Sequence, residues 1–457
     1  MTTVQSRRAF CSRALSAGAV ALSLAGSRHT YGETGPSPRS DSIPSHLPRK
    51  LTMSSWQWAW LTHSEPDAAY GNLERVMEEL RERNFNSIRI DTALNWCFQA
   101  DGSLRGEVPI RQTFPGHSYR FRIVNHTGGH RVDVLKQLVK LMKLAKKYDI
   151  YVVLSDWEYM HTNWFTSDSR LRDEINSIPK EKRLLQLAQQ MDRLVKHLRD
   201  RGLEKQLAWI EPHNELDYSD FPKDDGSIRI HTEAIAYLRE RHPDILVSAN
   251  YGQSKTITTT ENTQLYDHHI YAGSTLYHDV WQQTVFHPEF SSENPKENKQ
   301  LKQLLQEQIT PYQEFAQYAP IVGESWTKRF WFYYNVNIEQ FDRFIIQRYA
   351  EIKDALKQNA DKLYAMHAKE AAHLKLPMVV TEGGFFYAPL NSRFEEAEAG
   401  LDYFDHLTDL AVQHDLWAFV MTTYNGPEVP VWWACPKWLK ENNDRFLKGI
   451  IVCFRQA

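Results

Sequence analysis

The stretch that decides the fold is residues 206–215, QLAWIEPHNE, a short apolar run that ends on polar residues. A second stretch of the same kind is residues 377–384, PMVVTEGG. Each pattern predicts a buried β-strand that stops on a carboxylate, Glu215 in the first and Glu382 in the second. Barrels of parallel strands keep their catalytic side chains at the carboxyl ends of the strands. The two stretches therefore predict two carboxylates on one rim of a barrel.

Six more short runs of apolar residues resemble these two, with amphipathic helical stretches between them. The eight predicted strands are residues 50–56, 86–90, 150–154, 206–210, 245–249, 267–271, 377–381 and 416–422. Apolar residues at helical spacing predict helices over residues 72–83, 131–148, 182–201, 231–242 and 394–414. Strands that alternate with helices indicate a parallel sheet. Eight such repeats favour an α/β fold of the closed (β/α)8 TIM barrel type.

Two connections are much longer than the others. Residues 97–130 follow the second predicted strand, and residues 272–376 follow the sixth. The second connection contains an aromatic run at residues 326–334 and a predicted long helix at residues 338–369. We expect both inserts at the catalytic face, where they would shape a cleft.

The N-terminus has the features of an export signal rather than of a fold. Residues 6–10, SRRAF, form a twin-arginine pattern, and an apolar run follows at residues 14–25. That run is too short for a permanent membrane anchor. We therefore expect a twin-arginine signal peptide at residues 1–25, a flexible linker at residues 26–50 and a catalytic domain at residues 51–457, exported to the periplasm or beyond.

Composition excludes several classes of partner. Removing the leader, which holds three arginines and no acid, takes the net charge from −3 to −6. This mild acidity argues against nucleic acid as a partner. No glycine-rich loop of a phosphate-binding type opens a predicted helix. Outside the leader the cysteines are Cys97, Cys435 and Cys453, an odd number that favours free thiols over a disulfide framework.

The residues at the predicted strand ends resemble those of clan A glycoside hydrolases, most nearly the cellulase-like barrels. In that clan an Asn-Glu pair ends the fourth strand and a second Glu ends the seventh. An arginine near the end of the second strand and a His-x-Tyr on the sixth are also typical. The matching positions in this chain are Arg89, Asn214, Glu215, His269, Tyr271 and Glu382.

The resemblance implies a retaining glycoside hydrolase that cleaves a β-linked oligo- or polysaccharide without a cofactor. Glu382 would be the nucleophile, held ionised by Arg89, and Glu215 the general acid and base. Asn214 would bond the sugar 2-hydroxyl, and Tyr271 would orient the nucleophile. Trp209 and Pro212 near Glu215 would supply an apolar setting that raises its pKa.

The chain departs from the clan at two strands. The third predicted strand ends Asp156-Trp157, where many relatives carry a histidine. The end of the eighth strand and the residues after it read FVMTTY at residues 419–424, where relatives usually place a tryptophan; Trp432 or Trp433 from the following loop could take its place. The tryptophans expected to contact sugar are Trp56, Trp157 and Trp432. Packing in a thick core is the alternative role for each of them.

Other interpretations remain open from the sequence. Glu324 also follows a strand-like run, at residues 319–325, and could replace Glu382 as the nucleophile. Arg89 could instead form a purely structural ion pair with Asp91. A metal-dependent barrel hydrolase would draw ligands from the histidines His161, His213, His268 and His269, although His268 and His269 would point to opposite faces of a strand. A barrel that binds glycans without cleaving them is the alternative from another functional class.

Overall fold

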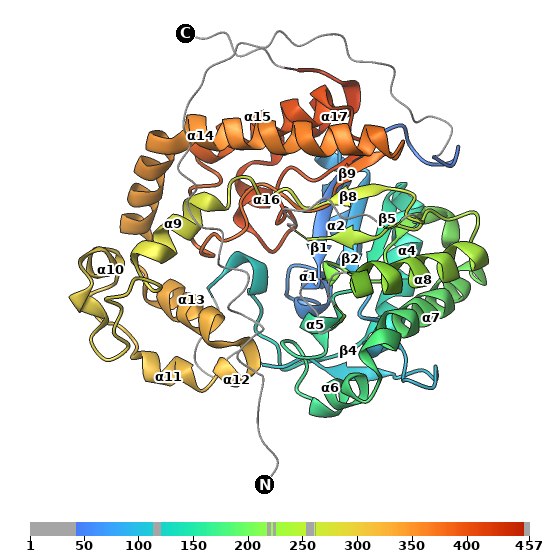
Figure 1. Ribbon diagram of the computed structural model, residues 1–457, viewed down its shortest axis with the longest axis horizontal. Helices are drawn as coiled ribbons and strands as arrows, with labels where there is room; N and C mark the ends of the chain where they lie inside the picture. Colours follow the sequence, from blue (N-terminus) through green and yellow to red (C-terminus); the bar gives the residue numbers. More distant parts are fainter. Residues whose placement is uncertain are drawn as a thin grey trace.

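The computed structural model describes residues 43–112, 120–216, 221–222, 225–252, 260 and 262–451. Helices surround a central group of strands, and a further group of helices lies beside them (Figure 1). The predicted signal peptide and most of the predicted linker lie outside the described residues. No helix in the described part of the chain is both long enough and apolar enough to cross a membrane.

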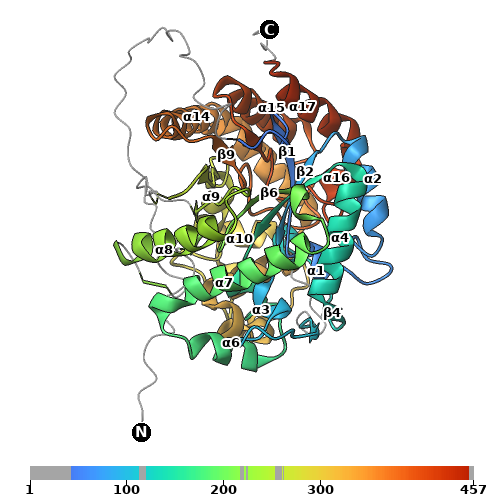
Figure 2. The ribbon, with the colours of Figure 1, turned by 90° about the vertical axis from the view of Figure 1, so that its right-hand side faces the viewer.

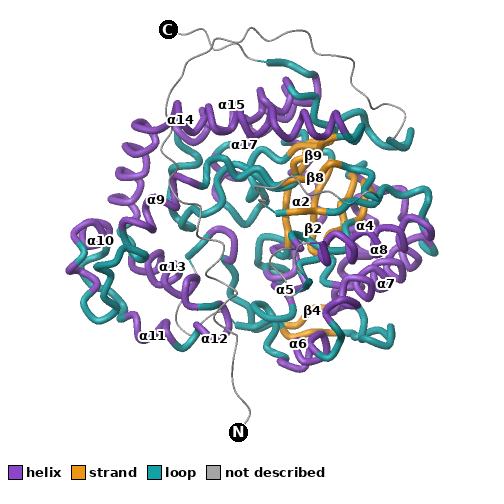
Figure 3. The backbone as a smooth tube through the Cα atoms, in the orientation of Figure 1, coloured by secondary structure: helices purple, strands orange, loops and turns teal. Residues whose placement is uncertain are grey.

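Eight parallel strands form one sheet, in the order β6-β5-β2-β1-β10-β9-β8-β7. They are β1 (Leu51–Gln57), β2 (Ser87–Asp91), β5 (Tyr151–Ser155), β6 (Leu207–Ile210), β7 (Asn250–Tyr251), β8 (Tyr266–His268), β9 (Met378–Val380) and β10 (Ala418–Phe419). The two edges also meet, because the Ile210 amide donates to the Leu246 carbonyl at 2.9 Å and the Ser248 amide donates to the Ile210 carbonyl at 3.0 Å. The predicted (β/α)8 barrel is therefore confirmed, and Figure 3 shows its strands enclosed by helices.

Long helices cover the outside of the barrel, as Figure 2 shows for α4, α7 and α8. The outer helices are α2 (Leu73–Glu82), α4 (Val134–Tyr148), α7 (Lys180–Arg199), α8 (Asp225–Arg241), α14 (Ile338–His373), α15 (Glu398–Gln413) and α17 (Pro436–Lys448). Each predicted helix corresponds to one of them, but α4 begins three residues after the predicted start. The Asp133 carboxylate caps α4 by accepting a bond from the Lys136 amide at 3.0 Å. Residues 131–133 instead form β4, which pairs with β3 (Glu107–Pro109).

Short helices follow several strand ends. They are α1 (Ala59–Thr62), α3 (Leu94–Cys97), α5 (Glu158–His161), α6 (Ser169–Asn176) and α16 (Pro430–Ala434), with short 3-10 turns η1 (Arg122–Val124) and η2 (Glu204–Gln206). The insert after β8 contains α9 (Thr275–Gln283), η4 (Pro295–Glu297), α10 (Lys299–Leu304), α11 (Tyr312–Ala316), α12 (Ala319–Val322) and α13 (Glu324–Asn335). These helices form the group beside the barrel in Figure 1, and α14 returns the chain to β9. The strand-like run at residues 319–325 is thus wrong as a strand, because it folds as α12 and the start of α13.

The barrel interior has its own small apolar core. Met53, Val153, Trp209 and Val379 belong to it, together with Leu47. Leu47 is 8% exposed, so the packed domain begins before residue 51, within the segment that we expected to be a flexible linker. Because this core fills one end of the barrel with apolar side chains, polar groups are left for the other end, where the strands stop.

Candidate active site

Glu382 follows Thr381 just past the end of β9 and is held from both sides. The Ile270 amide donates to the Glu382 carbonyl at 2.9 Å, which sets the residue beside the end of β8. Arg89 Nη1 donates to Glu382 Oε1 at 2.7 Å, and the Tyr271 hydroxyl donates to Oε2. The chain then turns at Gly384, whose φ of +74° suits glycine, and an added Cβ there would lie 3.0 Å from the Met421 carbonyl.

Opposing effects act on the Glu382 carboxyl, which is only 2% exposed. Burial raises its pKa, whereas His269 and Arg89 lower it and the Glu215 carboxylate adds to the rise. The Arg89 guanidinium is therefore a main stabiliser of the ionised form that a nucleophile needs.

Glu215 follows β6 on a strained piece of backbone. Its φ is +45°, in the left-handed region that residues with a side chain rarely adopt. The Glu215 amide donates to Asn250 Oδ1 at 3.1 Å, a bond that anchors this conformation. Such strain at a buried carboxylate is typical of functional sites.

The imidazole of His269 connects the two carboxylates. Asn250 Nδ2 lies 3.0 Å from His269 Nε2 and donates to it, since Asn250 Oδ1 already accepts from Glu215. His269 Nδ1 therefore carries the ring proton and donates to Glu215 Oε1 at 2.5 Å. Burial lowers the pKa of His269 to about 4, so the ring is neutral at neutral pH.

The two carboxylates lie close together. One polar atom from each of Glu215, His269 and Glu382 lies within 4.8 Å of the other two. Retaining glycosidases place their carboxyl groups about 5–5.5 Å apart, whereas inverting enzymes need roughly 6.5–9.5 Å to fit a water molecule. The 4.8 Å limit on the distance between these atoms lies below the range that inverting enzymes need.

Arg89 is the centre of a buried network rather than a partner of Asp91. Its Nη2 donates to Glu211 Oε2 at 2.7 Å and to Asn214 Oδ1 at 2.6 Å. The Trp157 ring covers the guanidinium, with its centroid 4.4 Å from Cζ. The alternative ion pair with Asp91 is wrong, because the carboxylate of Asp91 faces His161 instead.

Asn214 is already engaged through both ends of its amide. Besides accepting from Arg89, it donates to the Tyr159 hydroxyl at 3.0 Å. Its backbone amide donates to the Asp156 carbonyl at 2.8 Å. The expected contact with a sugar 2-hydroxyl stays a prediction, and the network shows how the side chain would be held ready for it.

Three polar residues of this site were not anticipated. Glu211, in the opening stretch, accepts from Arg89 and also from Trp209 Nε1 at 2.6 Å. Asn250 on β7 orients both Glu215 and His269. Burial, and then the neighbouring Glu211 carboxylate, raise the pKa of Asp267 well above its usual value. A polar residue at the edge of each apolar run was the available signal.

Tyr424 lies in the segment that follows the last strand of the barrel, β10. Its ring lies 5.7 Å from Phe386, and its buried hydroxyl has no hydrogen-bond partner among the described residues. Burial raises its pKa, and the Glu382 and Glu215 carboxylates add to that rise. Tyr424 therefore lies near both carboxylates with a free hydroxyl, so the tryptophan expected near this position is replaced by a tyrosine.

The predicted tryptophans pack in the core. Trp432 has no exposed surface and stacks on Phe85 at 6.0 Å, with the Arg83 guanidinium 4.4 Å from its ring. Trp56 is 1% exposed and packs against Tyr70. Neither presents a face to a ligand, which corrects our expectation of sugar stacking. Trp157 is equally buried, and its contact is with Arg89.

The insert after β8 reaches the site through aromatic residues. Burial, and to a smaller extent the nearby Glu215 carboxylate, raise the pKa of Tyr387 to about 12. The Tyr387 ring packs on Trp281 at 4.6 Å and on Trp326 at 6.2 Å, both from the insert. The insert thus supports the wall of the site, as its position in the sequence predicts.

Glu324, the alternative nucleophile, and His268, an alternative metal ligand, lie away from this site. Glu324 starts α13, is exposed, and accepts a bond from the Tyr312 hydroxyl at 2.5 Å. His268 stacks on His367 at 4.7 Å, on the opposite side of the strand from His269. Within the described residues, two groups of acidic and histidine side chains are close enough to share a cation: Glu215, His269 and Glu382, and Asp91, Asp156 and His161. The cysteines Cys97 and Cys435 are free.

Comparisons with known proteins bear on the family and the fold of this chain. A protein-family model described as cellulase-like and sugar-binding matches residues 53–447. A crystal structure from Parabacteroides distasonis, provisionally titled a glycoside hydrolase, superposes with a TM-score of 0.63 at 16% identity, covering 89% of this chain and 96% of that one. A glycoside hydrolase family 5 mannosidase from Rhizomucor miehei gives a TM-score of 0.45 at 11% identity, covering 88% and 94%. At these identities the likeness concerns the fold alone. A search of curated proteins finds no match.

Proposed function

Since this chain belongs to the sugar-binding, cellulase-like family, we propose that it is a retaining glycoside hydrolase acting on a β-linked glycan. The observation that carries this proposal is the pair Glu215 and Glu382, at the ends of two different strands and within 4.8 Å of each other. The Arg89 guanidinium binds the Glu382 carboxylate, and the neutral imidazole of His269 binds Glu215. Two close carboxyl groups in different environments are what acid and nucleophile roles require.

In the first step Glu382 attacks the anomeric carbon and forms a glycosyl ester. The bond from that carbon to the leaving oxygen breaks, and Glu215 delivers its proton to the oxygen. Arg89 and Tyr271 hold Glu382 so that one oxygen is aimed at the sugar. His269 binds Oε1 of Glu215 and so orients the carboxyl group that carries the proton in transit.

In the second step Glu215 acts as a base. It takes a proton from water while the water oxygen attacks the anomeric carbon, and Glu382 leaves as a carboxylate. Arg89 favours this departure because it stabilises the negative charge that returns to Glu382. Two inversions at one carbon give net retention of configuration.

The test is a screen of purified protein on aryl β-glycosides, including glucosides, mannosides, galactosides and xylosides, and on polysaccharides. Hydrolysis followed by NMR should release the β-anomer first. Release of the α-anomer first would overturn the retaining mechanism. Activity that disappears on chelation and returns with metal would favour a metal-dependent hydrolase, and glycan binding without turnover on any substrate would favour a binding barrel.

We also propose that the chain is exported through the twin-arginine route. The pattern at residues 6–10 and the apolar run after it support this proposal. A reporter fused to residues 1–45 should reach the periplasm of a bacterial host, and R7K together with R8K should block it. Export that persists in the double variant would contradict the proposal.

A further inference from the structure

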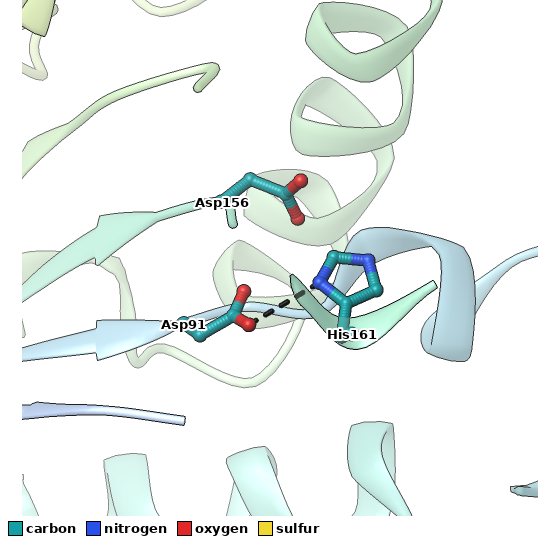
Figure 4. A group of neighbouring side chains, drawn as sticks. All are labelled: Asp91, Asp156 and His161. Carbon is teal, nitrogen blue, oxygen red and sulfur yellow. Dashed lines mark hydrogen bonds and ion pairs between the residues drawn. The ribbon is translucent and has the colours of Figure 1, made fainter. Parts of the chain in front are cut away.

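A second buried cluster lies next to the segment that carries Asn214 and Glu215. It consists of Asp91 at the end of β2, Asp156 just after β5, and His161 in α5 (Figure 4). All three side chains are fully buried, with 0% of each residue exposed. One polar atom from each lies within 4.8 Å of the others. Neither step of the proposed reaction uses them.

Asp91 is held in one orientation. Its Oδ1 accepts from the Ala93 amide at 2.8 Å and from the Trp157 amide at 3.1 Å. The other oxygen, Oδ2, lies 3.2 Å from His161 Nδ1. The backbone therefore fixes the carboxylate so that Oδ2 is directed at the imidazole.

Asp156 has an oxygen that the protein leaves unpaired. Its Oδ2 accepts from the Leu94 amide at 2.8 Å and from the Thr92 hydroxyl at 3.2 Å. Its Oδ1 is buried and has no hydrogen-bond partner among the residues that the structure describes. Figure 4 shows this carboxyl group facing His161. A buried, unpaired carboxyl oxygen is costly, so it points to a partner that accepts electron pairs.

His161 has the surroundings of a metal ligand. Its Nε2 lies 3.4 Å from Asn95 Oδ1, an acceptor, so in the tautomer that carries the ring proton on Nε2 the Nδ1 lone pair faces Asp91 Oδ2. The 3.2 Å between Nδ1 and Asp91 Oδ2 matches the roughly 3.3 Å between neighbouring ligands in a tetrahedral site with bonds of about 2.0–2.1 Å. Two lone-pair acceptors facing each other at that distance need a cation or a proton between them.

We propose that Asp91, Asp156 and His161 bind a divalent cation, with Zn²⁺ as the best fit to two carboxylate oxygens and one imidazole nitrogen. A dication balances the charge of two carboxylates where water cannot do so. Three protein ligands leave a fourth position for a water molecule. One carboxyl oxygen of Asp156 already lies within 4.8 Å of the ligand atoms of Asp91 and His161.

The cation would be structural, and it would support the catalytic layer. Asp156 holds Asn214 through its carbonyl oxygen at 2.8 Å, and Asp91 holds the Trp157 amide at 3.1 Å. The Trp157 ring in turn lies against Arg89. A cation that joins the ends of β2 and β5 therefore fixes residues that position Asn214 and Arg89.

The experiment measures metal on the untagged protein directly. The full chain is equilibrated with ZnCl2, freed of unbound metal by gel filtration, and analysed by inductively coupled plasma mass spectrometry. We expect about one zinc per chain, and a melting temperature that falls when dipicolinate removes it. D156N preserves the shape and the Leu94 bond but replaces the unpaired oxygen with an amide nitrogen, so it should retain no zinc and show no zinc-dependent melting shift.

The matched control is E382Q, which alters the other acidic and histidine group, Glu215, His269 and Glu382. This variant should keep its zinc. A parent protein without stoichiometric zinc, or a D156N variant that retains it, would overturn the proposal. Zinc lost only in E382Q would overturn it too, because the metal would then belong to the catalytic group. If D156N does not fold, H161Q gives the same comparison, and the parent measurement alone remains decisive.

Discussion

Replacing Arg89 with glutamine should shift the pH dependence of catalysis in a direction that the structure dictates. Arg89 donates to Glu382 and Glu211 at 2.7 Å each, and no part of it is exposed. Glutamine removes the charge, so the Glu382 carboxylate loses a charge-assisted hydrogen bond worth about 1.5–3 kcal/mol. One pKa unit corresponds to about 1.4 kcal/mol, so the pKa of Glu382 should rise by about 1–2 units.

Because the nucleophile must be ionised, kcat/KM falls as the pH drops below the pKa of Glu382 in the free enzyme. The acidic limb of the profile should therefore move up by about 1–2 pH units in R89Q, measured on an activated aryl glycoside. Breaking a buried ion pair also costs about 3–5 kcal/mol of unfolding free energy. Urea unfolding, followed by circular dichroism, measures that loss and shows which conditions keep the variant folded.

R122Q is the matched control for R89Q. Arg122 is also buried and also contacts two carboxylates, Glu395 at 3.0 Å and Glu396 at 2.7 Å, but these lie just before α15 and away from Glu382. The control should lose comparable stability without moving the acidic limb. A folded R89Q with the parental limb, or an equal shift in R122Q, would refute the reasoning.

Three further changes have defined outcomes. E215Q should lower kcat/KM by about 10²–10⁴ on substrates with poor leaving groups and much less on dinitrophenyl glycosides, which need little protonation; equal losses on both would argue against Glu215 as the acid. Y424F removes a buried hydroxyl that has no partner in the described structure, so it should leave the melting temperature unchanged while lowering kcat/KM by about 3–10-fold through a lost sugar contact; unchanged kinetics would exclude that contact. Burial raises the pKa of Glu428 from 4.5 to about 7, so between these pH values the folded state holds a proton that the unfolded state has lost. The free energy of unfolding therefore falls as the pH rises through this window. E428Q cannot lose that proton, so in urea titrations its stability relative to the parent should increase between about pH 4.5 and 7, and a constant difference would contradict this.

The sequence predicted the elements whose pattern is local. A short apolar run that stops on a carboxylate is visible in a few residues, so seven of the eight predicted strands overlap an observed strand, and Glu215 and Glu382 follow two of them. The predicted strand at residues 245–249 ends just before β7, which is Asn250–Tyr251. The sequence also predicted that His268 and His269 point to opposite faces, because the side chains of neighbouring strand residues alternate between the two faces.

What the sequence could not predict depends on contacts between distant segments. Asn250 and Asp267 are single polar residues at the edges of apolar runs, and only closure of the barrel brings Asn250 to Glu215. Trp432 was expected at a sugar because it follows the last strand, but the residues that bury it, Arg83 and Phe85, lie far from it in the sequence. The short apolar segment at residues 319–325 fits a strand or a helix equally well, and its packing in the insert decided for a helix.

Covalent trapping tests the identity of the nucleophile most directly. A 2-deoxy-2-fluoro glycoside with a good leaving group slows the second step, so the glycosyl ester accumulates and can be located by peptide mass spectrometry. The probe carries whichever sugar the aryl glycoside screen identifies. We expect one sugar per chain, attached to Glu382, and no labelling of E382Q. Labelling at another carboxylate, or turnover of the parent substrate by E382Q at the parental rate, would contradict the proposed mechanism.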